Sequence, residues 1–209
     1  MSRLRAVSLA AALVGWSFAG PRLPVTWRIA LQAGGGGLLV AATRAPLGLH
    51  PPRLWAGLRM GSAAGVAAMT VIAATTSVSE VRTAMASRVL PQSVLGWLAL
   101  QIPVGTVWGE EAAFRAALAT AGAEAFGRSG GRLLQATAFG LSHIADARAT
   151  GAPLLPTVLV TGIAGWLFGW LAQRSDSLAA PMLAHLAVNE AGAVAALAIQ
   201  RGYTRGSAS

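Results

Sequence analysis

The sequence predicts an all-α protein, a polytopic transmembrane bundle of about six to eight helices. Only 11% of its 209 residues are charged and 55% are hydrophobic, with a mean hydropathy of +0.59, whereas soluble domains contain about 25% charged residues. The charges are also spaced so that long apolar runs lie between them, which is typical of helices that cross a bilayer. We therefore expect a single integral-membrane domain over residues 1–209.

The excess of basic residues does not indicate a nucleic-acid partner. All 16 basic residues are arginines, and with 7 acidic residues they give a net charge of +9. They are scattered singly between the apolar runs, as expected of loops that flank membrane spans. The absence of cysteine excludes a disulfide framework and a cysteine nucleophile. The expected surroundings are membrane lipid, in a multi-pass protein of the cell membrane.

Seven apolar runs define the expected helices in chain order. A span needs about 20 apolar residues, so three runs are long enough alone. The others are long enough only if neighbouring polar residues are included in the span and are buried by helix packing. The first run follows Arg3 and Arg5 and ends on small residues, as a secretory signal does, but we interpret it as an uncleaved first span. The runs are 6–21, 29–43, 60–79 (20 residues), 89–109 (21 residues), 133–145, 149–173 (25 residues) and 178–200.

Loops are expected where Pro, Gly and Arg gather. Two pairs of small residues at four-residue spacing, Gly61 with Gly65 and Gly165 with Gly169, are expected to let helix backbones approach closely. No linker divides the chain into separate parts. The expected loops are 44–59, 80–88, 124–132, 146–156 and 174–176.

Candidates for chemistry are the ionisable residues next to or inside the apolar runs, because such groups are costly in a membrane. Glu110 and Glu111 follow the 89–109 run, which places them near one membrane face or in a cavity open to it. Glu111 and Arg115 share a helical face and can form an ion pair that offsets the cost of burial. Glu110 points about 100° away, and its unpaired carboxylate is suited to take a proton from water.

Two later segments place polar residues at four-residue spacing. Phe139 and His143 share one helical face, and His185 and Asn189 share another. Singly, each is explained as well by helix packing, since a lone histidine is often an interhelical hydrogen-bond partner. Two imidazoles, an amide and a free carboxylate are together the groups needed to activate water and stabilise an oxyanion.

The ordered motifs Glu110-Glu111-x-x-x-Arg115, Phe139-x-x-x-His143 and His185-x-x-x-Asn189 resemble those of the CPBP family of intramembrane proteases. This family includes the CAAX prenyl endopeptidases and bacteriocin-processing enzymes. The resemblance covers 92–195, which would be the protease-like core, and it extends to the segments 165–169 and 177–184 that precede the third motif.

The resemblance implies an intramembrane endopeptidase that hydrolyses a peptide bond of a membrane-associated or prenylated client with glutamate-activated water. It implies that Glu110 is the base, that His143 and His185 assist it, and that Asn189 polarises the scissile carbonyl or holds the oxyanion. The remaining motif residues, Glu111, Arg115 and Phe139, would support these four. The set Glu110, His143 and His185 could also bind Zn²⁺, so metal-dependent and metal-independent reactions both stay open.

Other intramembrane chemistries fit the sequence less well. His185 is followed by Leu186, so the His-Glu-x-x-His zinc motif is absent, and Asp146 and Asp176 are expected in loops, unlike an aspartyl pair. A rhomboid-like serine protease using Ser142 and His185 is an alternative, although it leaves the two glutamates without a task. The non-enzymatic alternatives are a catalytically inactive membrane scaffold or immunity factor, and a transport pathway.

Overall fold

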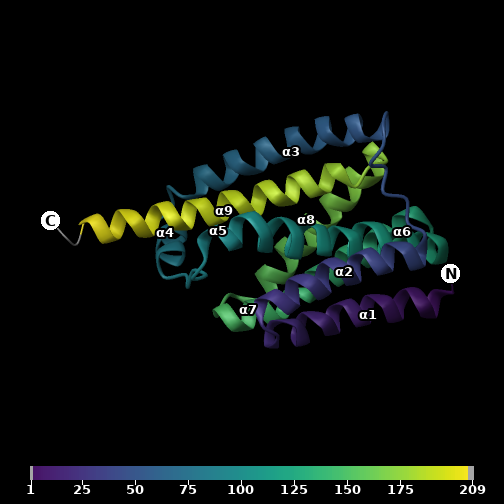
Figure 1. Ribbon diagram of the computed structural model, residues 1–209, viewed down its shortest axis with the longest axis horizontal. Helices are drawn as coiled ribbons and strands as arrows, with labels where there is room; N and C mark the ends of the chain where they lie inside the picture. The colour runs from purple at the N-terminus through teal and green to yellow at the C-terminus, as the bar shows by residue number, and fades with distance from the viewer. Residues whose placement is uncertain (1, 207–209) are drawn as a thin grey trace.

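The computed structural model describes residues 2–206, and within this range the chain is helical without any strand. The predicted all-α bundle is confirmed. The long helices run back and forth along one axis (Figure 1). The elements are α1 (Arg3–Ala19), η1 (Gly20–Arg22), α2 (Val25–Thr43), α3 (Arg53–Thr75), α4 (Ser79–Ala86), α5 (Val94–Gly96), η2 (Trp97–Trp108), η3 (Glu111–Leu118), α6 (Ala119–Ser142), α7 (Ile144–Thr150), α8 (Leu154–Ser175) and α9 (Ala179–Gly206).

Four helical segments are long and apolar enough to cross a membrane: Arg3–Arg22, Arg53–Thr75, Leu154–Ser175 and Ala179–Gly202. Large apolar side chains point outward from them, and on α8 Val160 is 65% exposed. Contiguous exposed apolar surface marks contact with lipid or a partner. The chain is a membrane protein. The run 89–109, which we expected to qualify alone, is not among the four.

The first motif lies in the middle of a continuous helical path from Val94 to Phe126. Gly109, Glu110 and Ala119, which join its parts, keep right-handed helical angles. The parts on either side of Glu110, η2 and η3, are wound as π-helix, a geometry often found at functional sites. Glu110 therefore lies within a helical path and not at a helix end.

The chain reverses direction at Gly127, whose φ of 76° and ψ of 168° suit glycine. The helices before and after this residue cross where two glycines meet, because a Cβ on Gly122 would lie 2.8 Å from the Cα of Gly131. The loop expected at 124–132 is wrong. A single glycine interrupts the helix there, and the neighbouring glycines serve close packing.

Other expected loops are shorter than their composition indicated. The segments 80–88 and 146–156 contain the short helices α4 and α7. The loop expected at 44–59 ends early, because α3 begins at Arg53, and α8 continues to Ser175. The close approaches predicted at the glycine pairs are confirmed: a Cβ on Gly65 would lie 3.1 Å from that of Ala187, and one on Gly165 would lie 3.2 Å from that of Phe139.

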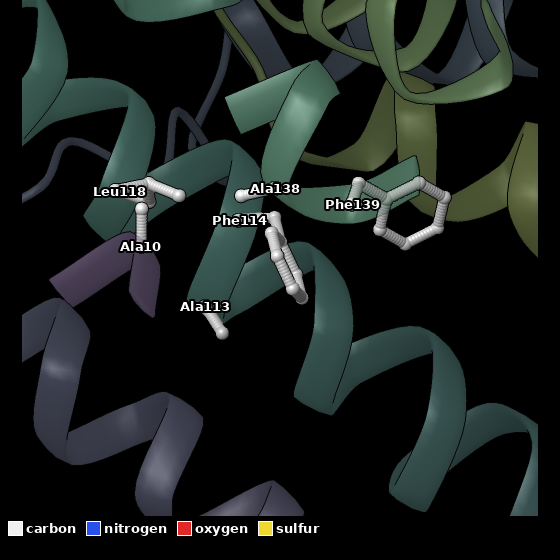
Figure 2. Close-up of a cluster of buried hydrophobic side chains, with 6 residues drawn as sticks. All are labelled: Ala10, Ala113, Phe114, Leu118, Ala138 and Phe139. Carbon is white, nitrogen blue, oxygen red and sulfur yellow. The ribbon is translucent and has the colours of Figure 1, made fainter. Parts of the chain in front are cut away.

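A buried cluster ties the two helices around Gly127 to α1. The rings of Phe114 and Phe139 meet edge to face with centroids 5.3 Å apart, a favoured aromatic arrangement. This contact fixes the helix that ends at the second motif against the helix that carries Glu110. The cluster in Figure 2 consists of Ala10, Ala113, Phe114, Leu118, Ala138 and Phe139.

Candidate active site

Residues of all three motifs line one cavity of about 980 Å³. Glu110 comes from the junction of η2 and η3, His143 from the end of α6, and Asn189 from α9. The Glu110 side chain is 24% exposed, so this carboxylate is accessible from the cavity. The fold thus brings three of the four predicted catalytic residues to a common space from distant parts of the chain.

The fourth residue, His185, lies behind Glu110 and between two carboxylates. Its Nδ1 is 2.7 Å from Oε1 of Glu111. An ionised carboxylate only accepts hydrogen bonds, so Nδ1 carries the proton and donates it. On the other side of the ring, Nε2 lies 3.9 Å from Oε2 of Glu110. This distance is too long for a direct hydrogen bond and short enough for one water molecule to contact both atoms.

Glu110 keeps an unused acceptor. Its Oε2 is buried and has no hydrogen-bond partner among the described residues. A buried carboxylate oxygen without a partner is costly, so it favours a water or substrate group at this position. The neighbouring carboxylate, that of Glu111, is by contrast fully buried, and both Arg115 and His185 contact its Oε1.

Arg115 and two aromatic rings support the Glu111–His185 pair from the interior. Nη1 of Arg115 lies 3.3 Å from Oε1 of Glu111, and both side chains are buried. The guanidinium carbon is 3.8 Å from the centre of the Phe139 ring and 5.1 Å from that of Phe168, within cation–π range. Phe168 also stacks on the His185 ring with centroids 5.1 Å apart. These contacts restrict the rotation of the Arg115 and His185 side chains.

His143 is oriented by its own helix. Its Nδ1 is 2.8 Å from the backbone carbonyl of Phe139, and a carbonyl only accepts, so Nδ1 is the donor and Nε2 is the free ring nitrogen. Its ring also meets the Phe139 ring edge to face at 4.7 Å. The Ser142 hydroxyl donates to the same carbonyl and forms no hydrogen bond with His185. The dyad required by the serine-protease alternative is therefore not assembled.

Asn189 projects from α9 one turn after His185. Its Nδ2 donates to the His185 backbone carbonyl at 3.3 Å, and the amide retains a second N–H. The imidazole and the amide thus stay together, as their spacing predicts.

The side chains are not arranged as a three-ligand zinc site. Across residues 2–206 there is no group of three or more His, Cys, Asp or Glu side chains placed to hold a metal ion. Glu110 and His185 are neighbours, but His143 does not complete a set with them in this part of the chain. Zinc binding by these three residues stays a prediction.

Two supporting contacts could not be predicted from the sequence. We assigned Glu111 to Arg115 alone, because the i,i+4 spacing is visible in the sequence, whereas the bond to His185 joins residues 74 positions apart. The role of Phe168 was also missed. The one available signal was its position between Gly165 and Gly169, where close helix packing directs a side chain into the interior.

Comparison with known proteins identifies the family. No curated protein and no solved structure matches the chain. Residues 88–191 match the family described as type II CAAX prenyl endopeptidase, Rce1-like, a family of proteases that act on membrane-associated substrates. The matched region contains all three motifs and every side chain described above around Glu110. Through this region, the chain belongs to the Rce1-like type II CAAX prenyl endopeptidase family.

Proposed function

We propose that this protein is a multi-pass endopeptidase of the cell membrane that cleaves a membrane-associated client, prenylated clients included, by glutamate-activated water. The observation that carries the proposal is the position of Glu110: its accessible carboxylate lines the cavity with His143 and Asn189, and its unpartnered oxygen faces His185. A base, two oriented imidazoles and an amide donor can together activate water and stabilise the oxyanion formed in peptide hydrolysis.

In the proposed reaction, a water molecule between Glu110 and the substrate gives a proton to the Glu110 carboxylate while its oxygen attacks the scissile carbonyl carbon. The carbonyl oxygen becomes an oxyanion, and the free N–H of Asn189 donates to it, assisted by His143. The tetrahedral intermediate then collapses, the C–N bond breaks, and Glu110 returns the proton to the leaving nitrogen. His185, fixed by Glu111, holds the water and Glu110 in position.

Replacing Glu110 by Gln tests this role. Glu110→Gln keeps the shape of the side chain but removes the proton acceptor, so cleavage should fall by about 10² to 10⁴-fold, the usual contribution of a general base. Folding should survive. The measurement is mass spectrometry of peptide products formed by the purified protein in lipid vesicles.

Ser142→Ala is the matched control for the same assay. It should retain cleavage, because the Ser142 hydroxyl donates to the Phe139 carbonyl and forms no hydrogen bond with His185, whereas a serine protease would lose nearly all turnover with its nucleophile. Activity that survives Glu110→Gln and disappears in Ser142→Ala would overturn the glutamate mechanism. A wild-type protein that cleaves no peptide of a broad set would instead favour the scaffold or immunity-factor alternative.

Chelation tests zinc in a separate experiment. Because the cavity residues do not form a three-ligand set, we expect full cleavage after dialysis against a chelator. A metal-dependent enzyme would lose activity and regain it with added Zn²⁺. Metal content measured on the same samples shows whether the chelator removed an ion at all.

A further inference from the structure

The cavity extends well beyond the residues around Glu110. Along η2 its wall continues through Thr106, Ile102 and Trp97, side chains separated by steps of four to five residues on one face of this helix. The cavity thus runs from Glu110 toward the beginning of η2. That end of the bundle also holds α4, α7 and the connection between α1 and α2 (Figure 1).

The extended part of the cavity is basic. Four arginines line the cavity, against two carboxylates, Glu110 and Asp146. The arginines come from four separate segments: η1, α2, the connection between α4 and α5, and α7. Among the described residues, none of the four forms an ion pair. They are Arg22, Arg28, Arg88 and Arg148.

Arg28 is the best placed of the four to bind a ligand. Arg22 donates to the backbone carbonyl of Phe18, and Arg88 lies over the Trp97 ring. Arg28 is half-buried. Its backbone N–H donates to the carbonyl of Pro24, but within the described chain its guanidinium forms no hydrogen bond, ion pair or ring contact. A partly desolvated guanidinium without a counter-ion favours an anion in the cavity that it lines.

Helix packing places Arg28 close to the level of Glu110. A Cβ on Gly109 would lie 3.1 Å from that of Gln32, and one on Gly105 would lie 3.0 Å from Cγ1 of Ile29. The helix α2 therefore runs parallel to η2, with Arg28 one turn before the level of Glu110. One turn between Arg28 and Gln32 rises about 6 Å, which is the length of about two residues of an extended peptide.

We propose that the basic part of the cavity binds a carboxylate of the client peptide about two residues from the cleaved bond, with Arg28 as the specificity-determining residue. This rests on the proposed function. The carboxylate can belong to an acidic side chain or to the carboxyl terminus of the client, since both match the planar donor fork of a guanidinium. Four cationic side chains against two acidic ones also attract such a segment into the cavity.

The test uses the full chain in phosphatidylcholine vesicles and three palmitoylated decapeptides that share a neutral parent sequence. The first ends in a free carboxylate, the second in an amide, and the third in an amide but carries a single Glu. Binding is measured by quenching of tryptophan fluorescence by a dinitrophenyl group on the peptide, because Trp16 and Trp97 line the cavity. Cleavage is measured separately as kcat/KM.

The wild type should bind and cleave at least one carboxylate peptide about ten-fold better than the neutral one, the usual scale of a charge-assisted hydrogen bond. Arg28→Gln should bring binding and cleavage of the carboxylate peptides to the level of the neutral peptide, and Arg28→Lys should restore part of the difference. The control is Arg82→Gln, an exposed arginine of α4 outside the cavity. Comparison of the first and third peptides distinguishes a terminal carboxylate from an acidic side chain.

A preference that persists in Arg28→Gln, or that is absent from the wild type, overturns the proposal. Arg28-dependent binding of phosphatidylglycerol without any peptide preference would overturn it too, and would assign the site to a lipid headgroup. Arg28-dependent peptide binding without cleavage would support the carboxylate site and contradict the proposed peptidase. Cleavage whose rate on all three peptides is the same in the wild type and in Arg28→Gln would support the peptidase and contradict the carboxylate site.

Discussion

The buried charges of the site depend on one another. Glu111 and Arg115 are both enclosed in apolar surroundings, and His185 shares the same carboxylate oxygen with the arginine. Charges removed from water are tolerated only when they are paired. The sequence was sufficient to predict the Glu111–Arg115 contact from its spacing. It was not sufficient to predict that the same carboxylate orients His185, because that contact depends on how α9 packs.

Removal of Arg115 should therefore strand a buried carboxylate. We expect Arg115→Ala to lower the free energy of unfolding by about 3 to 5 kcal/mol, the usual cost of breaking a buried pair, with further loss from the missing cation–π contacts. Thermal unfolding in detergent measures this, and Arg82→Ala in the exposed helix α4 is the control. If Arg115→Ala kept its stability and lost only cleavage, Arg115 would belong to the substrate site instead.

At the scale of elements, composition misled where glycine packs helices rather than breaking them. Gly127, Gly130 and Gly131 predicted a loop, yet only Gly127 leaves the helical conformation. Gly131 instead allows the helix after the turn to cross the helix before it, within contact of Gly122. The distinction depends on what lies opposite each glycine, which a single sequence does not reveal. The same chain segment then carries His143 to the cavity.

Gly131→Ala should consequently separate the two crossing helices. The added Cβ would clash with the backbone of Ala123, which cannot yield as a flexible side chain could, so we expect a loss of about 1 to 3 kcal/mol, typical of overpacking. Gly34→Ala is the matched control, because no atom lies within 4 Å of its added Cβ, and helix propensity alone should make it neutral or stabilising. Equal thermal unfolding of the two variants in detergent would contradict the crossing.

At the scale of the whole molecule, the bundle was predictable and its assembly was not. Apolar runs and charge spacing were enough to predict the fold class, because an apolar run of sufficient length indicates a helix in the bilayer. The motifs were enough to name Glu110, His143 and Asn189, and the structure places all three on one cavity. The cavity itself includes side chains from α1, α2 and α3, where the sequence offered no pattern beyond apolarity. Arg28 is one of these.

The proposed multi-pass arrangement predicts which ends of the helices share a side of the membrane. The start of α1 and the label of α6 lie at one end of the bundle, and α4 and α7 lie at the other (Figure 1). Because the chain contains no cysteine, single cysteines can be introduced without background labelling.

Four exposed positions suit this purpose: Ser2, Ser129, Ser87 and Thr150. In intact cells, a membrane-impermeant maleimide should label Ser2→Cys and Ser129→Cys alike, and Ser87→Cys and Thr150→Cys in the opposite way. Labelling after permeabilisation provides the control for reactivity. If all four cysteines responded equally in intact cells, the two ends of the bundle would not lie on opposite sides of the bilayer, and the proposed multi-pass arrangement would be wrong.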